Sequence, residues 1–92
     1  MIQKDEKAQL IMNMTENLPT LRKKLNLTQD ELSGMIGVSR GTIAAIENKK
    51  RKMTWNMFLA LQLVFTKNKG TDKLLNAMEI YTDDFNEFIK LR

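Results

Sequence analysis

The spacing of apolar residues predicts a short, well-defined helix at the start of residues 28–48. Thr28 and Glu31 have the spacing of a capping box, so this helix is expected to begin immediately after Thr28. Leu32 and Ile36 follow four residues apart and therefore share one face of the helix. The segment thus has a clear start and one apolar stripe to bury.

A turn and a second helix are predicted to follow directly. Gly37 stands where a helix end favours a left-handed residue, and Val38 continues the apolar series inside the turn. Ser39 is expected to cap the second helix, on which Ile43 and Ile46 share a face. The two helices can then bury their stripes together while the second presents its other side outward.

The remaining regular structure is also predicted to be helical, because no stretch alternates convincingly with β-branched residues. The expected fold class is all-α, with five to six helices. A weakly helical segment covers residues 5–14. Thr15 or Asn17 is expected to cap the next helix, with Pro19 in its first turn, where the missing amide is tolerated. The buried stripe of that helix would be Leu18, Leu21 and Leu25.

Threonines are expected to cap the three helices of the second half, at Thr54, Thr71 and Thr82. The helix after Thr54 carries the largest aromatic block of the chain. Its apolar positions are Trp55, Phe58, Leu59, Leu63 and Phe65. Residues 67–70 form a turn before the helix at Thr71, and two aspartates in the first turn after Thr82 suit the helix dipole.

Length and composition predict one domain that lacks the usual catalytic residues. The 92 residues are divided into an N-terminal helical segment (1–16), a core (17–66) and C-terminal helices (67–92). The chain has no cysteine and no histidine, so disulfides, the usual zinc sets and the commonest general base are missing. We expect neither an enzyme nor a cofactor or metal site. No apolar run is long enough for a membrane span, and a cytoplasmic location is expected.

Charge is distributed unevenly along the chain. The net charge of +4 says little by itself. Between residues 38 and 56, however, five basic residues face only Glu47, whereas five acids outnumber three bases from residue 71 to 92. The run Lys49–Lys52 follows the second helix of the pair, where it favours phosphate contact over an ordinary solvated loop.

The paired helices resemble a known DNA-binding motif. Thr-Gln-x-Glu-Leu from Thr28, Gly-Val-Ser from Gly37 and Thr-Ile-x-x-Ile-Glu-Asn from Thr42 resemble, in register, the helix-turn-helix of the phage-repressor type, the Cro and cI repressors or XRE family. The resemblance extends from about Leu18 to Phe65. It implies a lambda-repressor-like domain that binds double-stranded DNA through the second, recognition helix.

The outward face of the recognition helix is expected to contact bases. The resemblance implies base contacts from Ser39, Arg40, Gly41, Thr42, Ala44 and Ala45. Small residues there permit close approach, and Arg40 is the only long donor. A bidentate pair with guanine would discriminate by about 1–3 kcal/mol, which predicts a guanine in each half-site. A phosphate contact by Arg40 is the alternative.

The resemblance also implies residues that contact the DNA backbone and residues that stabilise the fold. Contacts with the sugar-phosphate backbone are expected from Gln29, Asn48, Lys49, Lys50, Arg51 and Lys52. The resemblance further implies an ion pair between Arg22 and Glu47, which would tie the helix that contains Leu18, Leu21 and Leu25 to the recognition helix. Two residues depart from the family pattern. Gly41 lies inside a helix, and Lys49 stands where many similar chains have glycine.

Taken together, these features predict a transcriptional regulator that acts as a homodimer on a near-palindromic operator. They favour a repressor over an activator, because blocking a site requires only that it be occupied. Dimer contacts are expected on the C-terminal helix, at Phe85, Phe88, Ile89 and Leu91, or else at Ile11 and Met14. Alternatively, these two ends pack together and close the core of the monomer. The rival function is an antitoxin-like or antirepressor-like module in which residues 71–92 bind a partner protein.

Overall fold

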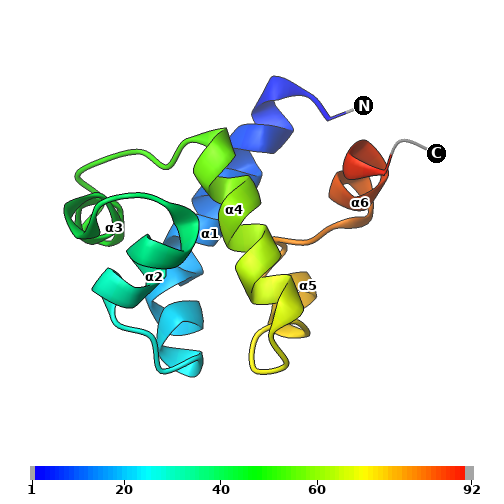
Figure 1. Cartoon of the computed structure of the whole chain (residues 1–92). Helices are drawn as coiled ribbons and strands as arrows, with labels where there is room; N and C mark the ends of the chain where they lie inside the picture. Colours follow the sequence, from blue (N-terminus) through cyan, green and yellow to red (C-terminus); the bar gives the residue numbers. More distant parts are fainter. Residues whose placement is uncertain (1, 91–92) are drawn as a thin grey trace.

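The computed structural model describes residues 2–90, and within that range all regular structure is helical, which confirms the all-α fold class (Figure 1). The helices are α1 (Lys4–Lys24), α2 (Gln29–Ile36), α3 (Arg40–Glu47), α4 (Trp55–Lys67), α5 (Leu74–Ala77) and α6 (Asp83–Ile89). α2 and α3 pack against each other, and α1 contacts both α3 and α4. In Figure 1 the pair α2 and α3 lies on one side of α4, and α5 and α6 lie on the other.

One continuous helix replaces the two N-terminal helices predicted from the sequence. α1 has 21 residues, and neither Thr15 nor Asn17 caps a new helix within it. Instead, each side chain donates a hydrogen bond to the carbonyl four residues earlier. The Thr15 hydroxyl donates to Ile11 O at 2.8 Å, and the Asn17 amide donates to Asn13 O at 2.8 Å. The expected boundary between residues 1–16 and the following core therefore does not coincide with the end of a helix.

Pro19 lies inside α1, and the burial of one apolar stripe explains why the helix continues through it. A proline in a helix interior costs about 3 kcal/mol through the lost hydrogen bond and the clash with the preceding turn. The stripe runs along both sides of Pro19 at Leu10, Met14, Leu18 and Leu21, each at most 5% exposed. Ending the helix before Pro19 would break this stripe, so tertiary packing outweighs the local preference.

Side-chain caps begin four of the helices as predicted. The hydroxyl oxygens of Thr28, Ser39, Thr54 and Thr82 each accept the amide N–H three residues later, at 3.0 to 3.1 Å. Thr71 is the exception, because its side chain is fully buried and its hydroxyl donates to Phe65 O at 2.7 Å. It anchors the turn after α4, and α5 begins only at Leu74.

The core is centred on α4, where Phe58, Leu61 and Phe65 are fully buried. Leu63 was expected among these residues but is 62% exposed. It lies two residues after Leu61, about 200° around the helix, and therefore on the opposite face. α4 thus presents one apolar face to the core and leaves Leu63 in solvent.

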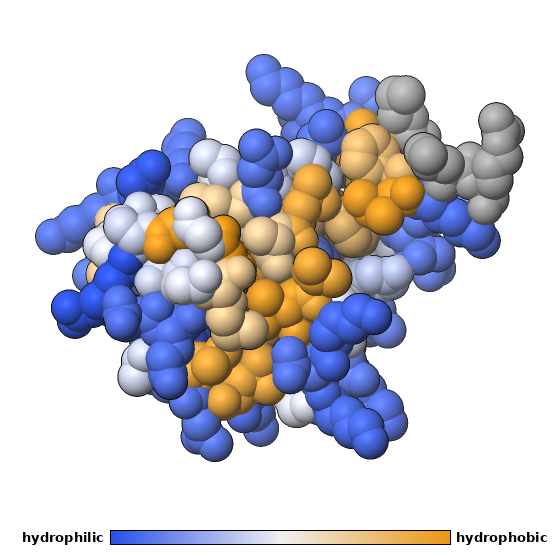
Figure 2. All heavy atoms as spheres, in the orientation of Figure 1, coloured by the Kyte–Doolittle hydropathy of each residue, from blue (hydrophilic) through white to orange (hydrophobic). Residues whose placement is uncertain are grey.

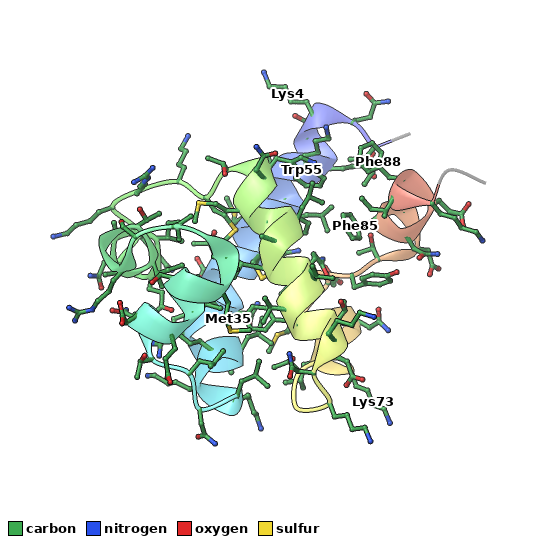
Figure 3. All side chains as sticks on the ribbon, in the orientation of Figure 1. Lys4, Met35, Trp55, Lys73, Phe85 and Phe88 are labelled. Carbon is green, nitrogen blue, oxygen red and sulfur yellow. The ribbon has the colours of Figure 1, made fainter. Side chains whose placement is uncertain are left out.

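α6 is held against the core by an aromatic cluster (Figure 3). The rings of Trp55 and Phe58 stack at 4.9 Å, and Phe85 meets Phe58 edge-on at 5.5 Å. The Lys7 ammonium on α1 lies 5.1 Å from the ring centres of both Trp55 and Phe88. Cation–π and aromatic contacts therefore join the N-terminal part of α1 to α6.

These contacts correct part of the predicted dimer surface. Phe85 is 3% exposed and Met14 is fully buried, so both belong to the core of the monomer, as the alternative reading of the two ends supposed. Phe88 is half-buried, whereas Ile89 is 49% exposed. The last candidate, Leu91, lies outside the described residues.

Candidate nucleic-acid interface

The turn between α2 and α3 fixes the relative position of these helices. Gly37 has a φ of 76°, the left-handed conformation that glycine adopts without strain. Its N–H and that of Val38 both donate to Ser33 O, at 2.9 and 3.0 Å. Leu32 of α2 and Ile43 of α3 are fully buried beneath the turn. α3 is thereby seated with one face on the core and the other facing outward.

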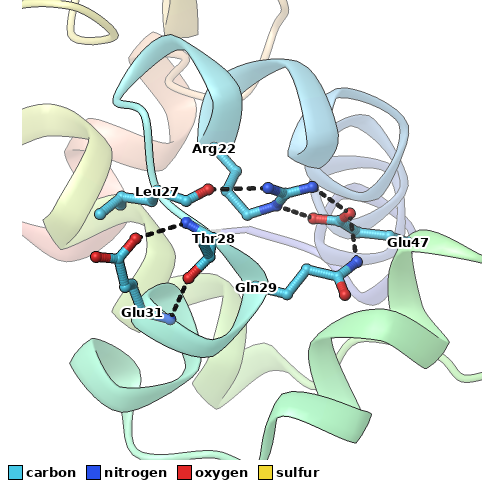
Figure 4. A network of polar contacts seen from close by, with 6 residues as sticks. All are labelled: Arg22, Leu27, Thr28, Gln29, Glu31 and Glu47. Carbon is cyan, nitrogen blue, oxygen red and sulfur yellow. Dashed lines mark hydrogen bonds and ion pairs between the residues drawn. The ribbon is translucent and has the colours of Figure 1, made fainter.

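A network of polar contacts joins α1, α2 and α3 (Figure 4). Arg22 donates to both carboxylate oxygens of Glu47, from Nε at 2.8 Å and from Nη2 at 3.0 Å. The remaining guanidinium nitrogen, Nη1, donates to Leu27 O at 2.9 Å. The Gln29 amide donates to Glu47 Oε1 at 3.0 Å. The predicted pair is therefore present and is bidentate, the strongest arrangement for arginine and a carboxylate.

The ion pair is largely withdrawn from water, since the Arg22 and Glu47 side chains are only 11% and 7% exposed. Burial by itself raises the pKa of Glu47. The hydrogen bonds from Arg22 and Gln29, together with the positive charges of Arg22 and Lys23, outweigh that effect and lower the pKa below its ordinary value. The hydrogen bond to Glu47 raises the pKa of Arg22. Both side chains therefore stay charged at neutral pH.

Gln29, for which the sequence predicts a contact with the DNA backbone, also belongs to this network. Its amide nitrogen has two hydrogens, of which one is directed at Glu47. The side chain is half-buried at the start of α2. Its position links the first turn of α2 to the last turn of α3, and one donor remains for a phosphate oxygen.

The outward face of α3 is small except at its first residue. Arg40 and Gly41 are exposed, and Ala44 and Ala45 are half-buried. Ser39 is exposed, but its hydroxyl caps the helix by accepting Thr42 N–H at 3.1 Å. Arg40 is therefore the only long side chain that α3 presents at its exposed N-terminal end.

Thr42 does not belong to the outward face, contrary to its predicted contact with bases. The residue is 8% exposed. Its hydroxyl lies 2.9 Å from the Ser39 hydroxyl and accepts a hydrogen bond from Arg51 Nη1 at 3.2 Å. Thr42 lies four residues before the buried Ile46, on the same face of the helix, and so turns partly toward the core. Thr42 thus connects the cap of α3 to residues 49–52, here called the basic loop.

The basic loop begins with a Schellman motif, a pair of hydrogen bonds that closes the end of a helix. Lys49 N–H donates to Ile46 O at 3.0 Å, and Lys50 N–H donates to Ala45 O at 2.8 Å. Lys49 has a φ of 62°, the left-handed conformation that this motif requires. Such a position favours glycine, and Lys49 therefore adopts a conformation that is uncommon for lysine.

The four cations of the loop have different surroundings. Lys49 Nζ lies 2.7 Å from Glu16 Oε1 on α1, in an ion pair whose side chains are more than half exposed. Arg51 contacts Thr42, whereas Lys50 and Lys52 are exposed and make no ion pair with any residue of the 2–90 range. The contact of Glu16 with Lys49 had no sequence signal, because 33 positions separate the two residues.

Replacing Gly41 by alanine is expected to raise the free energy of unfolding by about 0.5–1 kcal/mol, measured by urea denaturation. Gly41 lies in α3, and a Cβ there would approach nothing closer than Ser39 Oγ at 3.8 Å. Gly34→Ala in α2 is the matched control, since a Cβ there would meet nothing within 4 Å. Both variants should gain stability. A loss in Gly41→Ala alone would contradict the unstrained geometry of α3.

Comparison with known proteins gives one match. Residues 15–82 match the family model described as helix-turn-helix domain. The matched range includes α2, the turn and α3. No curated protein and no solved structure matched the chain. Within residues 2–90, no helix is long and apolar enough to cross a membrane, and no three potential metal-ligating residues cluster together. The chain belongs to the helix-turn-helix domain family and is a DNA-binding regulator of the phage-repressor type.

Proposed function

We propose that the protein binds double-stranded DNA sequence-specifically as a homodimer and represses transcription by occupying a near-palindromic operator. The observation that carries this proposal is the outward face of α3, which has small side chains and begins with the exposed residues Arg40 and Gly41. The network of Arg22, Glu47 and Gln29 holds that helix rigidly on the core. A rigid helix with a small outer face is suited to close approach to the major groove.

Base recognition in this proposal depends on the N-terminal half of α3. Arg40 can present its planar guanidinium to O6 and N7 of guanine, because no described residue forms an ion pair with it. Gly41, Ala44 and Ala45 would allow the helix to lie deep in the groove, with the alanine methyl groups against thymine. Ser39 would contact the bases from its exposed position at the start of α3.

Contacts with the DNA backbone would come from residues around α3. Lys50 and Lys52 are the strongest candidates because their charges are free to meet phosphates. Asn48 and Arg51 lie beside them, and Gln29 retains one amide hydrogen. Lys49 would have to exchange its Glu16 partner for a phosphate oxygen, so we expect it to contribute least among the cations.

The proposed homodimer would double the length of DNA that is read. One recognition helix contacts only a few base pairs, and a two-fold dimer places two half-sites about one helical turn apart. Figure 2 shows hydrophobic residues along α4 and continuing to α6. Ile89, which is 49% exposed, and the exposed edge of Phe88 are the side chains on α6 that remain available for a second copy. Repression requires only that the bound dimer block the site.

Arg40→Ala is expected to weaken specific binding by about 5- to 150-fold, corresponding to about 1–3 kcal/mol, and to remove the preference for guanine. The preferred duplex is first selected from a random pool with the wild-type protein. Titrations at several salt concentrations then compare the variants on that duplex and on one with the guanine replaced.

Lys52→Ala is the matched control for Arg40→Ala, because it removes a cation beside α3 without touching the recognition helix. It should weaken binding to all sequences alike and reduce the salt dependence by about one phosphate contact. If Arg40→Ala behaves in the same way as Lys52→Ala, Arg40 contacts a phosphate. If no duplex is enriched by the wild type, the proposed sequence-specific function is wrong.

A further inference from the structure

A groove of about 560 Å³ lies between the N-terminal half of α1 and the basic loop, outside the face of α3 that is proposed to contact bases. Residues of α1 form the floor and one side of the groove, namely Ala8, Ile11, Met12, Thr15 and Glu16. Their spacing places them on a single helix face about 12 Å long. The other wall is residues 49–53, the segment that leaves α3. Such a length suits another helix laid alongside α1.

The floor of the groove is apolar and open to solvent. Met12 is 57% exposed, and among the described residues it is one of four large hydrophobic side chains with an exposed fraction between 49% and 62%. Ala8 beside it is also exposed, Ile11 is half-buried, and Met53 closes the bottom at 4% exposure. Methionine side chains adapt their shape to different apolar partners. A ligand that covered Met12 would bury surface that the folded monomer leaves in water.

The rim of the groove is strongly basic. Lys49, Lys50, Arg51 and Lys52 all line it, whereas Glu16 is the only carboxylate among the lining residues. That carboxylate is already paired with Lys49 at 2.7 Å. The exposed charges of Lys50 and Lys52 therefore stand beside the apolar floor without a described partner. An occupant must supply negative charge along one edge and apolar side chains along another.

We propose that this groove binds an amphipathic acidic helix of a partner protein. Apolar residues at helical spacing on that partner pack on Met12, Ile11 and Ala8. Carboxylates along the edge of the same helix pair with Lys50 and Lys52. The lining face of α1, which spans about two helical turns, accommodates a helix lying against α1, and the charge of the rim selects an acidic helix over a neutral or basic one.

The partner helix and DNA then exclude each other. Lys50 and Lys52 are also the main phosphate-binding cations of the proposed DNA complex, and a carboxylate of the partner helix repels a phosphate that approaches the same ammonium group. The partner therefore releases the protein from DNA by occupying its cations. This competition rests on the proposed function, whereas binding of the helix to the groove does not.

Direct binding is measured with a synthetic helical peptide of about 18 residues that carries leucines at helical spacing on one face and glutamates elsewhere. A peptide of the same composition in scrambled order, without an apolar face, is the peptide control. Met12→Asn removes apolar surface from the groove without changing its charge, and Met35→Asn is the matched protein control. Met35 is 55% exposed on α2, and it is not among the residues that line the groove.

We expect the amphipathic peptide to bind the wild type and Met35→Asn equally, and to bind Met12→Asn at least about tenfold more weakly. The scrambled peptide should bind at least about tenfold more weakly to the wild type. Equal binding of the two peptides would reduce the interaction to charge attraction and overturn the proposal, as would equal binding to Met12→Asn. A change of mass from dimer to monomer in Met12→Asn would assign the groove to a second copy instead and would also overturn it.

The same variants separate this proposal from the proposed function. Met12→Asn should retain wild-type affinity for the selected duplex, and displacing that duplex from Met12→Asn should require at least about tenfold more amphipathic peptide than displacing it from the wild type. Peptide binding without any DNA binding would leave the groove assignment intact while refuting sequence-specific DNA binding. Simultaneous binding of peptide and duplex would overturn the competition.

Discussion

Arg22→Ala is expected to lower the free energy of unfolding by about 3–5 kcal/mol, the loss typical when one partner of a buried ion pair is removed. The variant would lose two hydrogen bonds to Glu47 and one to Leu27 O. It would also leave the Glu47 carboxylate, only 7% exposed, with the Gln29 amide as its remaining side-chain donor. Such a loss is a large share of the stability of a small domain.

Urea denaturation of the wild type, Arg22→Ala and Arg22→Lys measures this loss. The lysine variant keeps the positive charge but cannot make the bidentate contact and also reach the Leu27 carbonyl, so it should lie between the other two. A loss below about 1 kcal/mol in Arg22→Ala would be the value of an exposed pair and would contradict the burial of the network.

The pH dependence gives a second measurement of the same network. The pKa of Glu47 is lowered in the folded protein from its ordinary value of 4.5, so the folded state favours the charged carboxylate. Its contribution is fully present above pH 4.5 and is lost as the pH falls through the lowered folded value. The wild type should therefore lose more stability than Arg22→Ala on acidification below pH 4.5.

Phe85→Ala is expected to destabilise the fold by about 3–5 kcal/mol, because it removes a buried aromatic side chain from the core. The ring is 3% exposed and meets Phe58 at 5.5 Å, Tyr81 at 5.6 Å and Trp55 at 6.1 Å. Its removal would leave a cavity between α4 and α6. Loss of this contact should weaken the attachment of α6 to the core.

Ile89→Asp on the same helix tests whether α6 also forms the proposed dimer contact. Ile89 is 49% exposed, so the aspartate should leave the melting temperature of the monomer nearly unchanged while shifting the mass in solution from dimer to monomer. Thermal melting and light scattering of Phe85→Ala and Ile89→Asp provide the comparison. An Ile89→Asp variant that stays dimeric would place the contact elsewhere, and a Phe85→Ala variant with unchanged stability would contradict the packing of α6.

The sequence by itself determined the features that depend on neighbouring residues. The caps at Thr28, Ser39, Thr54 and Thr82 were predictable because a side-chain oxygen and an amide three positions later meet within one helical turn. The turn at Gly37 was equally local, since its backbone conformation favours glycine. The resemblance to phage repressors added the long-range pair of Arg22 and Glu47, which no local rule supplies.

Tertiary structure alone decided the features in which burial competes with a local preference. Pro19 lies within a helix because the apolar stripe of α1 continues past it, and Thr71 anchors a turn instead of capping a helix because its hydroxyl reaches Phe65 O. Thr42 is withdrawn from the outward face of α3, and Phe85 enters the core. The sequence shows which residues are able to cap a helix or to be buried. Which of them actually do so depends on contacts with distant segments, and these contacts form only in the folded protein.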